Sequence, residues 1–386
     1  MAIDEYTGRA PATRDTDAVH LDAAGCALMA DQTVDAQLAS LTAERVHAVT
    51  AETKIKARAS VARLINADPR EIAILPSGSL AWFQALTSIP IRAGQTILVS
   101  SSEFFVNYIA LLRYAKNRPL ALQRIPDDHY GRSSSEQLTK ILGSHVGLVC
   151  VTHMSNNSGS LNPIHEIAKI CRTRNVPLLV DACQTVGQVP LDMKEIFCDY
   201  LVGTGRKFLR APRGTAFLYA KKTSLTNWPT IIDYPTARLD QSLAPMTRVS
   251  DAAIYELGEQ NLVALAGLKA AADSAMELDS TVIWRQINDI SLLVRDCLRS
   301  LPLILHEHGP ESGAIVTFHS KEIDSQEIIS RLADRHIFVG SARRRSTPLD
   351  QCSNERDLVR ISPHYYNTRE EIMNLHEELG RILYRF

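Results

Sequence analysis

The segment VPLLVDACQTVGQVPLDMKEIFCDYLVGTGRKFLRAPRG, residues 176–214, contains two short apolar runs, VPLLVD at 176–181 and DYLVG at 199–203. Short runs rich in Val and Leu, bounded by turn-forming residues, are typical of buried strands. Upstream, helical-period segments such as 164–174 separate further runs of this kind, which are EIAILP at 71–76, TILVS at 96–100, LALQRI at 120–125 and VGLVCVTH at 146–153. The alternation predicts an α/β sheet with covering helices.

Beyond residue 250 the pattern changes from alternating strands and helices to a long helical stretch over 258–300. One or two strands around AIVTFHS, residues 314–320, and a last helix from 368 follow this stretch. We therefore expect an N-terminal arm at 1–20, a large domain at 21–250 and a smaller α+β domain at 251–386.

Composition narrows the classes of partner. The formal charge of -1 and the pI near 6.9 provide no basic field for nucleic acid, and the run Arg343-Arg344-Arg345 is too short to change this. No stretch approaches the roughly 18 apolar residues that a membrane span needs. The seven cysteines are scattered and form no CxxC pair, which is typical of reduced thiols. We expect a cytoplasmic protein without a metal site that binds a small molecule.

Lys207 lies in a glycine-containing turn, TGRKFLRAPRG at 204–214, where small neighbours would let a ligand approach closely. A lysine buried beside the cation of Arg206 has a lowered pKa and forms imines readily. The alternative is a solvated loop lysine, because most lysines are exposed.

Two further sites lie where strands are expected to end. Asp181 ends the run VPLLVD, and ligands of α/β sheets bind beyond the carboxyl ends of the strands. Gln184 follows three residues later. The segment Ser77-Gly78-Ser79 lies between a strand and a helix, where backbone N–H groups and the helix dipole attract an anion. Ordinary helix capping is the alternative for both Asp181 and Ser77.

A lysine, a carboxylate and an anion site together suit pyridoxal 5'-phosphate (PLP). This cofactor stabilises a carbanion next to an amino group by delocalising its charge into a protonated pyridine ring. We predict a PLP enzyme in which Lys207 is the Schiff-base lysine and Asp181 pairs with the ring nitrogen.

Six segments occur together in one order along nearly the whole chain: HLDAAG at 20–25, SSEFF at 101–105 with Asn107 beyond it, VTHMSNNSG at 151–159, VDACQTVGQVPLD at 180–192, GTGRKFLRAPRGTAFLY at 203–219 and RISPHYYNTREEI at 360–372. In this order they resemble the class V aminotransferase family of fold type I. That family includes cysteine desulfurases, isopenicillin N epimerase-like proteins and ergothioneine-type C–S lyases. The resemblance implies a large, mainly parallel-sheet domain, a smaller α+β domain, PLP as cofactor and a homodimer.

The resemblance also assigns roles by position. It implies that Arg360 binds the substrate α-carboxylate, for which a bidentate guanidinium is well shaped. Ala24 and Arg345 are the other residues that it assigns to the substrate. For the cofactor it assigns Lys207 and Asp181 as above, Gln184 and Asn156 near the phenolic oxygen, Phe105 on the ring, and Gly78, Ser79, Thr204 and Arg206 at the phosphate.

Two departures from the family pattern bear on the reaction. In desulfurases the loop that reads VGSARRRSTPL here, residues 339–349, carries the catalytic cysteine, and this chain has arginines instead. These arginines either meet an anionic or bulky substrate or form a solvated basic loop. The second departure is in YELGEQNLVALAGL at 255–268, where a family threonine often reaches the partner subunit's phosphate and this chain has Glu259 or Gln260.

The forms GRKFLRAPRG and YELGEQN are most similar to the ergothioneine C–S lyase-like branch, which includes PLP enzymes of lincosamide-type antibiotic biosynthesis. We therefore expect β-elimination from a cysteine S-conjugate, with Lys207 as the base, to give thiol, pyruvate and ammonia. The alternatives are decarboxylative oxidative deamination of such a conjugate to an aldehyde, transamination, epimerisation, or a PLP-fold protein without catalysis.

Overall fold

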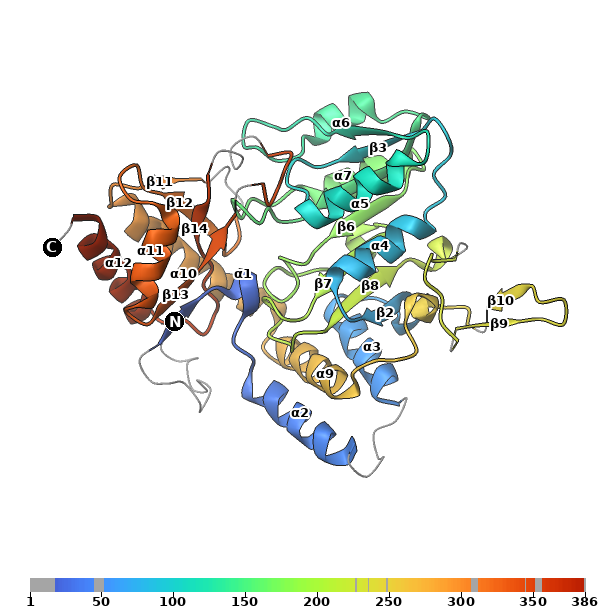
Figure 1. The fold of residues 1–386 in the computed structure, drawn as a ribbon, viewed down its shortest axis with the longest axis horizontal. Helices are drawn as coiled ribbons and strands as arrows, with labels where there is room; N and C mark the ends of the chain where they lie inside the picture. The colour runs from blue at the N-terminus through green and yellow to red at the C-terminus, as the bar shows by residue number, and fades with distance from the viewer. Residues whose placement is uncertain are drawn as a thin grey trace.

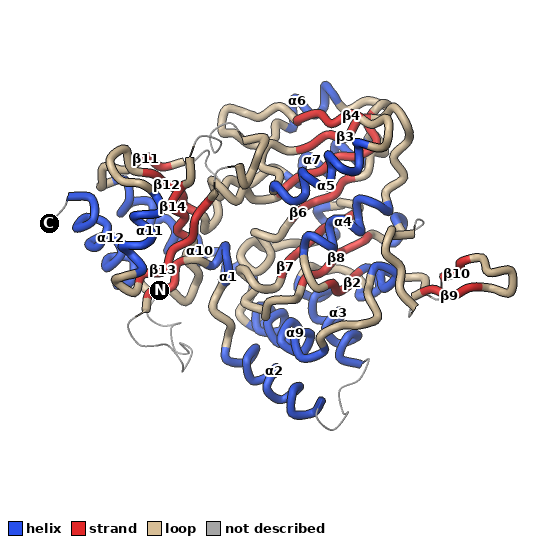
Figure 2. Tube along the Cα trace, viewed as in Figure 1, coloured by secondary structure: helices blue, strands red, loops and turns tan. Residues whose placement is uncertain are grey.

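The computed structural model of the 386-residue chain describes residues 18–44, 52–225, 228–234, 236–247, 249–306, 312–343, 345–350 and 356–384. Two sheets organise the described residues, one of seven strands and one of five. Figure 1 shows them in separate parts of the molecule, and Figure 2 shows that helices surround both.

All six apolar runs that the sequence predicts as strands lie in the seven-stranded sheet, in the order β2-β8-β7-β6-β5-β3-β4. The sequence analysis missed β8, which runs antiparallel to both β7 and β2 because a short loop returns the chain beside β7. The strands are β2 (Ile72–Leu75), β3 (Thr96–Val99), β4 (Ala121–Arg124), β5 (Val146–Thr152), β6 (Leu178–Asp181), β7 (Tyr200–Thr204) and β8 (Ala216–Ala220).

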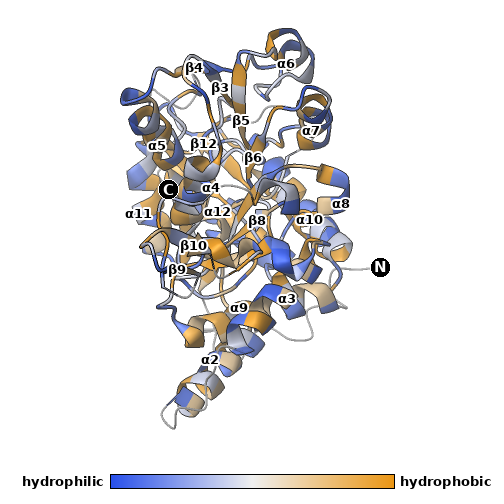
Figure 3. Cartoon of the chain, turned by 90° about the vertical axis from the view of Figure 1, so that its right-hand side faces the viewer, coloured by the Kyte–Doolittle hydropathy of each residue, from blue (hydrophilic) through white to orange (hydrophobic). Residues whose placement is uncertain are grey.

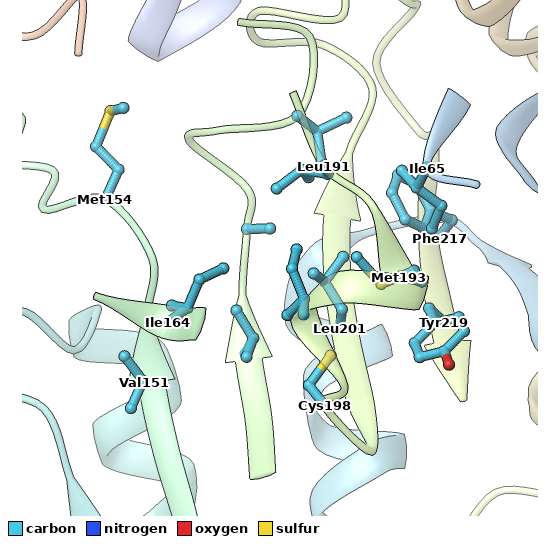
Figure 4. Packing of buried hydrophobic residues seen from close by; sticks show 14 of the residues in the cluster. Ile65, Val151, Met154, Ile164, Leu191, Met193, Cys198, Leu201, Phe217 and Tyr219 are labelled. Carbon is cyan, nitrogen blue, oxygen red and sulfur yellow. The ribbon is translucent and has the colours of Figure 1, made fainter. Parts of the chain in front are cut away.

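The central strands of this sheet are buried on both faces, which explains why they read as continuous apolar runs. Along β5, Leu148 and Cys150 belong to the core cluster under α4 and α5, while Val149 and Val151 belong to the cluster on the opposite face. Figure 4 shows part of that opposite cluster, and Figure 3 shows hydrophobic residues concentrated in the central strands. The α/β fold class is confirmed.

Helices cover both faces of the large sheet. Two of them, α4 (Gly78–Ser88) and α5 (Phe105–Lys116), pack on one face. Helices with residues in the core cluster of the other face include α3 (Glu52–Leu64), α6 (Ser135–Ile141), α7 (Ile164–Thr173), α8 (Met193–Ile196), α9 (Leu262–Glu277) and the start of α10 (Ser280–Arg299). Short 3-10 turns are η2 (Pro69–Glu71), η3 (Lys222–Ser224) and η4 (Ala252–Tyr255).

The smaller sheet has the order β1-β13-β14-β12-β11 and joins the beginning of the described chain to its end, because β1 pairs with β13 in parallel. It has more strands than the one or two that the sequence predicts. Its elements are β1 (Val19–Leu21), β11 (Ile304–Leu305), β12 (Val316–His319), β13 (Ile337–Ala342), β14 (Leu358–Ile361), α10 (Ser280–Arg299), α11 (Ser325–Ala333) and α12 (Arg369–Tyr384). The three helices share one core cluster with the sheet.

The predicted helical stretch over 258–300 is two helices, and the chain turns between them at Asp279, which has φ 64° and caps α10. α9 packs beside the large sheet. The start of α10 contributes Ile283 and Ile287 to the same core cluster, and the rest of α10 packs on the smaller sheet. Residues 1–17 of the predicted arm lie outside the described residues, and the division into domains stays a prediction. The remaining elements are α1 (Ala23–Cys26), α2 (Asp31–Glu44) and a hairpin of β9 (Ala237–Leu239) and β10 (Pro245–Thr247).

No helix in the described part of the chain is long and apolar enough to cross a membrane. Within the same residues, no three His, Cys, Asp or Glu side chains form a group that could hold a metal ion.

Candidate active site

The carboxyl ends of β5, β6 and β7 meet at two adjoining cavities that share Phe104, Asn156, Arg206 and Lys207 in their walls. The inner cavity has a volume of about 330 Å³ and the outer one about 450 Å³. The inner wall also includes Ser77, Gly78, Ser79, Ser102, Asn107, Thr152, Asp181, Cys183, Gln184 and Thr204. The outer wall also includes Ala24, Gly25, Phe105, Ser341, Arg343, Arg345, Ser346 and Arg360.

Lys207 lies in both cavity walls because a tight turn follows β7. A Cβ on Gly205 would lie 2.2 Å from Oγ1 of Thr215, so this position requires glycine. The pKa of Lys207 is lowered to about 8, chiefly because burial disfavours the charged form, and Arg206 and Arg360 act in the same direction. This buried environment favours the interpretation of Lys207 as an imine-forming lysine over its interpretation as a solvated loop lysine.

The segment after Arg360 contacts, through His364, the turn that carries Lys207. Nε2 of His364 donates to the carbonyl oxygen of Phe208 across 2.9 Å, and Nδ1 accepts from the amide of Tyr365 across 3.0 Å. Burial and the nearby Arg210 lower the pKa of His364 well below its usual value, so the ring is neutral. A neutral imidazole has one nitrogen that donates and one that accepts a hydrogen bond, which matches these two contacts. The motif RISPHYYN therefore connects β14 to the turn that carries the lysine.

Asp181 is the last residue of β6, and both of its carboxylate oxygens accept hydrogen bonds. Oδ1 accepts from the amide of Cys183 across 2.9 Å, and Oδ2 accepts from Nδ2 of Asn107 across 2.7 Å. No helix follows Asp181 directly, because residues 183–188 form turns, so its bond to the Cys183 amide is not the helix cap that the alternative expected. The helix α5 presents the Asn107 side chain to the same carboxylate. Asp181 is 8% exposed and lies in the wall of the inner cavity.

Glu103 lies directly behind this pair, because Nδ2 of Asn107 also donates to Oε1 of Glu103 across 2.8 Å. Oε1 accepts from Oγ1 of Thr152 as well, whereas the buried Oε2 has no partner among the described residues. Burial raises the pKa of Glu103 to about 8, and the charge of Asp181 adds to this increase. The sequence analysis missed Glu103 and Asn107 as site residues, although their spacing of four puts both near the first turn of one helix.

The N-terminus of α4 forms one wall of the inner cavity. Oγ of Ser77 accepts from the amide of Leu80 across 3.2 Å, so Ser77 caps the helix as the alternative interpretation expected. Gly78 and Ser79 occupy the first turn, whose amides lack intrahelical acceptors, and both line the cavity. The cap and an anion site are therefore compatible here.

Arg360 on β14 is fixed from two sides. Its Nη1 donates to Oδ1 of Asn156 across 2.6 Å, and its Nη2 lies 3.0 Å from Oδ1 of Asp22. Nε2 of Gln184 donates to the same oxygen of Asn156 across 2.8 Å and, at 3.4 Å, to the carbonyl oxygen of Ala24. The buried Nε of Arg360 and Oε1 of Gln184 have no partner among the described residues.

The aromatic position differs from the sequence prediction. Phe105 is 41% exposed and lines only the outer cavity, whereas Phe104 lines both cavities. The two rings contact each other edge to face, with centroids 4.8 Å apart. We therefore propose Phe104, which the sequence analysis overlooked, as the residue that supports the cofactor ring.

Glu259 and Gln260 are the candidates for the position where the family often carries a threonine. Gln260 donates from Nε2 to the carbonyl oxygen of Ile74 across 3.0 Å within its own chain, and Glu259 is exposed. In the loop of residues 339–349, Arg343 and Arg345 line the outer cavity, while Arg344 lies outside the described residues.

These cavities fit PLP. The inner one offers a helix N-terminus for a phosphate, a buried carboxylate for a ring nitrogen and a lysine with a lowered pKa for an aldehyde. The unpartnered polar atoms of Gln184 and Arg360 lie at buried positions where a bound molecule can supply the missing partner. When bound there, the cofactor supplies the electron sink for charge at the substrate α-carbon.

Comparison with known proteins agrees with this geometry. The family model of Aminotransferase class-V matches residues 19–375. A probable cysteine desulfurase from Synechocystis sp. is 27% identical over 82% of this chain and 77% of its own length, and a cysteine desulfurase from Salmonella newport is 26% identical over 94% and 93%.

Solved structures share the fold. The cysteine desulfurase CsdA from Escherichia coli has a TM-score of 0.90 and 20% identity, covering 100% of this chain and 99% of its own. The cystine C–S lyase C-DES, solved with its product cysteine persulfide, has a TM-score of 0.84 and 20% identity over 95% and 98%. The chain therefore belongs to the class V aminotransferases and is a PLP-dependent enzyme of fold type I.

Proposed function

We propose that the protein is a C–S lyase that cleaves a cysteine S-conjugate by β-elimination and releases a thiol, pyruvate and ammonia. Atoms balance with one water: the Cα–H and Cβ–S bonds break, the electron pair of the C–S bond leaves with sulfur, and hydrolysis gives pyruvate and ammonia. The structural similarity to C-DES, a cystine C–S lyase, is one support for this choice of reaction.

The observation that carries the proposal is the chemistry of the loop above Lys207. Loop 339–349 contains no cysteine, and Arg343 and Arg345 line the outer cavity where desulfurases of this family carry a thiol. Cys183 lines the inner cavity, but burial and the charge of Asp181 raise its pKa well above the usual value. A thiol that stays protonated is a poor nucleophile. Elimination needs no protein nucleophile, because a thiolate leaves once charge develops at Cα.

The side chains divide the work in this proposal. Arg360 binds the substrate α-carboxylate through its unpartnered Nε and remaining N–H groups, while Asn156 and Asp22 hold the guanidinium in place. Lys207 takes the α-proton on Nζ, for which a pKa near 8 is well matched to neutral pH. Asp181 pairs with the cofactor's ring nitrogen, and Asn107 orients the Asp181 carboxylate.

Arg206, Thr204 and the first turn of α4 bind the cofactor's phosphate in this arrangement, and Gln184 with Asn156 lies near its phenolic oxygen. Ala24 contributes backbone to the substrate side, where its carbonyl oxygen accepts from Gln184. The rival reaction is decarboxylative oxidative deamination to an aldehyde that retains sulfur, as in lincosamide-type antibiotic biosynthesis. Transamination and epimerisation share the same site residues.

A homodimer is part of the proposal. Helix α2 projects from the large domain (Figure 1) and exposes Val34, Leu38 and Leu41 at 36%, 58% and 53%. Spaced by four and three residues, they form one apolar stripe that a second copy of the chain would cover. Light scattering of the purified protein should give twice the monomer mass of 42.8 kDa. A monomer at micromolar concentration would contradict the dimer.

The test of the reaction is incubation of the holoenzyme with a panel of cysteine S-conjugates, with mass detection of every product. We expect thiol and pyruvate from at least one conjugate. A product that keeps its sulfur attached, whether an aldehyde, a keto acid or the opposite enantiomer, would reject elimination and identify which rival reaction occurs. Mass spectrometry of the protein after addition of L-cysteine should detect no persulfide, including on Cys352.

A further inference from the structure

The outer cavity carries more positive charge than the proposed reaction uses. Arg206, Lys207, Arg343, Arg345 and Arg360 line it, and its lining among the described residues contains no acidic side chain. Arg206 is assigned to the cofactor's phosphate, Lys207 to its aldehyde and Arg360 to the substrate α-carboxylate. The resemblance assigns Arg345 to the substrate without naming the group that it binds, and Arg343 has no assigned role.

Hydrogen bonds of the buried Ser346 and Thr347 hold the segment that follows Arg345 against the cavity wall. The amide of Ser346 donates to the carbonyl oxygen of Arg343 across 2.9 Å, and the carbonyl oxygen of Ser346 accepts from the amide of Phe105 across 3.0 Å. Oγ of Ser346 donates to Oδ1 of Asn157 across 2.7 Å, and Nδ2 of Asn157 donates to Oγ1 of the buried Thr347. The backbone is therefore anchored next to Asn156.

Arg345 has a backbone conformation that an arginine rarely adopts, with φ 62°. The residues that follow it, Ser346 and Thr347, are anchored by the hydrogen bonds above, which allows the surrounding contacts to maintain this conformation. The result is that Arg345 and Arg343 both line the outer cavity. Both side chains are exposed to solvent, so they can reach an anion that enters the outer cavity.

An acidic side chain that pairs with a cavity residue is Asp22. It pairs with Arg360, with Oδ1 and Nη2 3.0 Å apart. No acidic side chain among the described residues forms an ion pair with either loop arginine. Like charges in a partly enclosed cavity repel one another, and a bound anion removes this cost.

We infer that the S-linked group of the substrate carries a second anionic group, of which a carboxylate is the simplest, and that Arg343 and Arg345 bind it. The inference rests on the proposed function, because it takes the amino-acid end of the substrate to be anchored at Arg360 and Lys207. Guanidinium groups suit this task, since their planar forks donate two hydrogen bonds to one carboxylate.

A binding experiment tests the inference separately from the cleavage reaction. The probe is the carbon analogue of S-carboxyethyl-L-cysteine, in which a methylene replaces sulfur so that no thiolate can leave. Its terminal carboxamide is the neutral control ligand of nearly equal shape. Calorimetric titration of the holoenzyme should give about 10- to 100-fold tighter binding of the carboxylate than of the carboxamide, because hydrogen bonds to charged groups are the stronger ones.

The variants are the double substitution Arg343→Gln with Arg345→Gln, and Arg285→Gln as a control that removes a positive charge outside the cavities. Arg285 is exposed on α10 and lines neither cavity. The double variant should lose the preference for the carboxylate while it binds the carboxamide as the parent does, and the control should keep the preference. Equal binding of both ligands by the parent protein, or a preference that survives the double substitution, would overturn the inference.

Cleavage of the matching sulfur compounds separates the two proposals. Preferential binding of the carboxylate analogue together with no thiol release from S-carboxyethyl-L-cysteine would support the anion site and reject the lyase. Thiol release from this conjugate and its carboxamide at equal kcat/KM, with equal binding of the two analogues, would reject the anion site and leave the lyase standing.

Discussion

The side-chain amide of Asn107 donates a hydrogen bond to Oδ2 of Asp181 across 2.7 Å. Asn107 lies in the first turn of α5 and Asp181 ends β6, so the bond links a covering helix to the sheet at the inner cavity. The same amide nitrogen donates to Glu103, which makes Asn107 a bridge between two carboxyl groups. The arrangement predicts distinct effects for changes at each of the three residues.

Replacement of Asp181 by Ala should nearly abolish turnover, because the cofactor's ring nitrogen would lose its carboxylate partner and the electron sink would weaken. Asn107→Ala should have a smaller effect, a fall in kcat/KM of about 10- to 100-fold, which corresponds to a hydrogen bond to a charged group. Steady-state kinetics on a cleaved conjugate would measure both. Near-normal turnover of the Asp181 variant would remove Asp181 from the proposed site.

Glu103 should make folding stability depend on pH. In the unfolded chain its carboxyl ionises near the usual value of 4.5, whereas in the folded protein its pKa is about 8. The stability that the neutral carboxyl contributes is therefore complete below pH 4.5 and is lost as the pH rises through about 8. Glu103→Gln should remove this loss, which amounts to a few kcal/mol.

Urea unfolding between pH 5 and 9, roughly the range over which the carboxyl differs between the two states, measures this dependence. The free energy of unfolding of the parent protein should fall relative to that of the Glu103→Gln variant as the pH rises. Parallel curves for the two proteins would mean that Glu103 titrates alike in both states.

Lys207 should capture PLP at a rate that rises with pH. The neutral amine is the form that attacks an aldehyde, and its fraction increases as the pH passes through a pKa of about 8. Stopped-flow absorbance after mixing cofactor-free protein with PLP would follow this step. Lys207→Ala should give no borohydride-trapped adduct, and a trapped adduct in that variant would place the linkage on another lysine.

Arg360→Ala should raise the KM for the amino-acid substrate by about 100-fold, since a buried bidentate partner of the carboxylate is lost, while PLP stays bound. Arg360→Lys should recover only part of the loss because an ammonium cannot form the fork. Absorbance of the bound cofactor together with KM separates the two effects. Loss of PLP from the Ala variant would assign Arg360 to the cofactor instead.

The sequence predicted six strands of the large sheet, and five of them, β2, β3, β5, β6 and β7, are buried along their whole length and read as apolar runs. The sixth, β4, is a largely exposed edge strand. The sequence did not predict β8, since the turn after Lys207 determines its direction, or the five-stranded sheet, whose strand β1 pairs with residues more than three hundred positions away. Local patterns contain no information on such long-range pairing.

The candidate site follows the same rule. Asp181, Lys207, Gly78 and Ser79 lie next to strand ends, so local sequence was sufficient to single them out. Glu103 was missed because its role depends on burial and on Asp181, which lies far away in the chain. Phe104 and Phe105 are adjacent aromatic residues, and only the helix start at Phe105 determines which of them lines the inner cavity.

The most direct test of the central claim is the product balance of one cleaved conjugate, measured with and without oxygen. Elimination at Lys207 predicts that thiol, pyruvate and ammonia form in equal amounts and that removal of oxygen changes nothing, because water is the only co-reactant. Carbon dioxide and a sulfur-retaining aldehyde that form only when oxygen is present would contradict the claim.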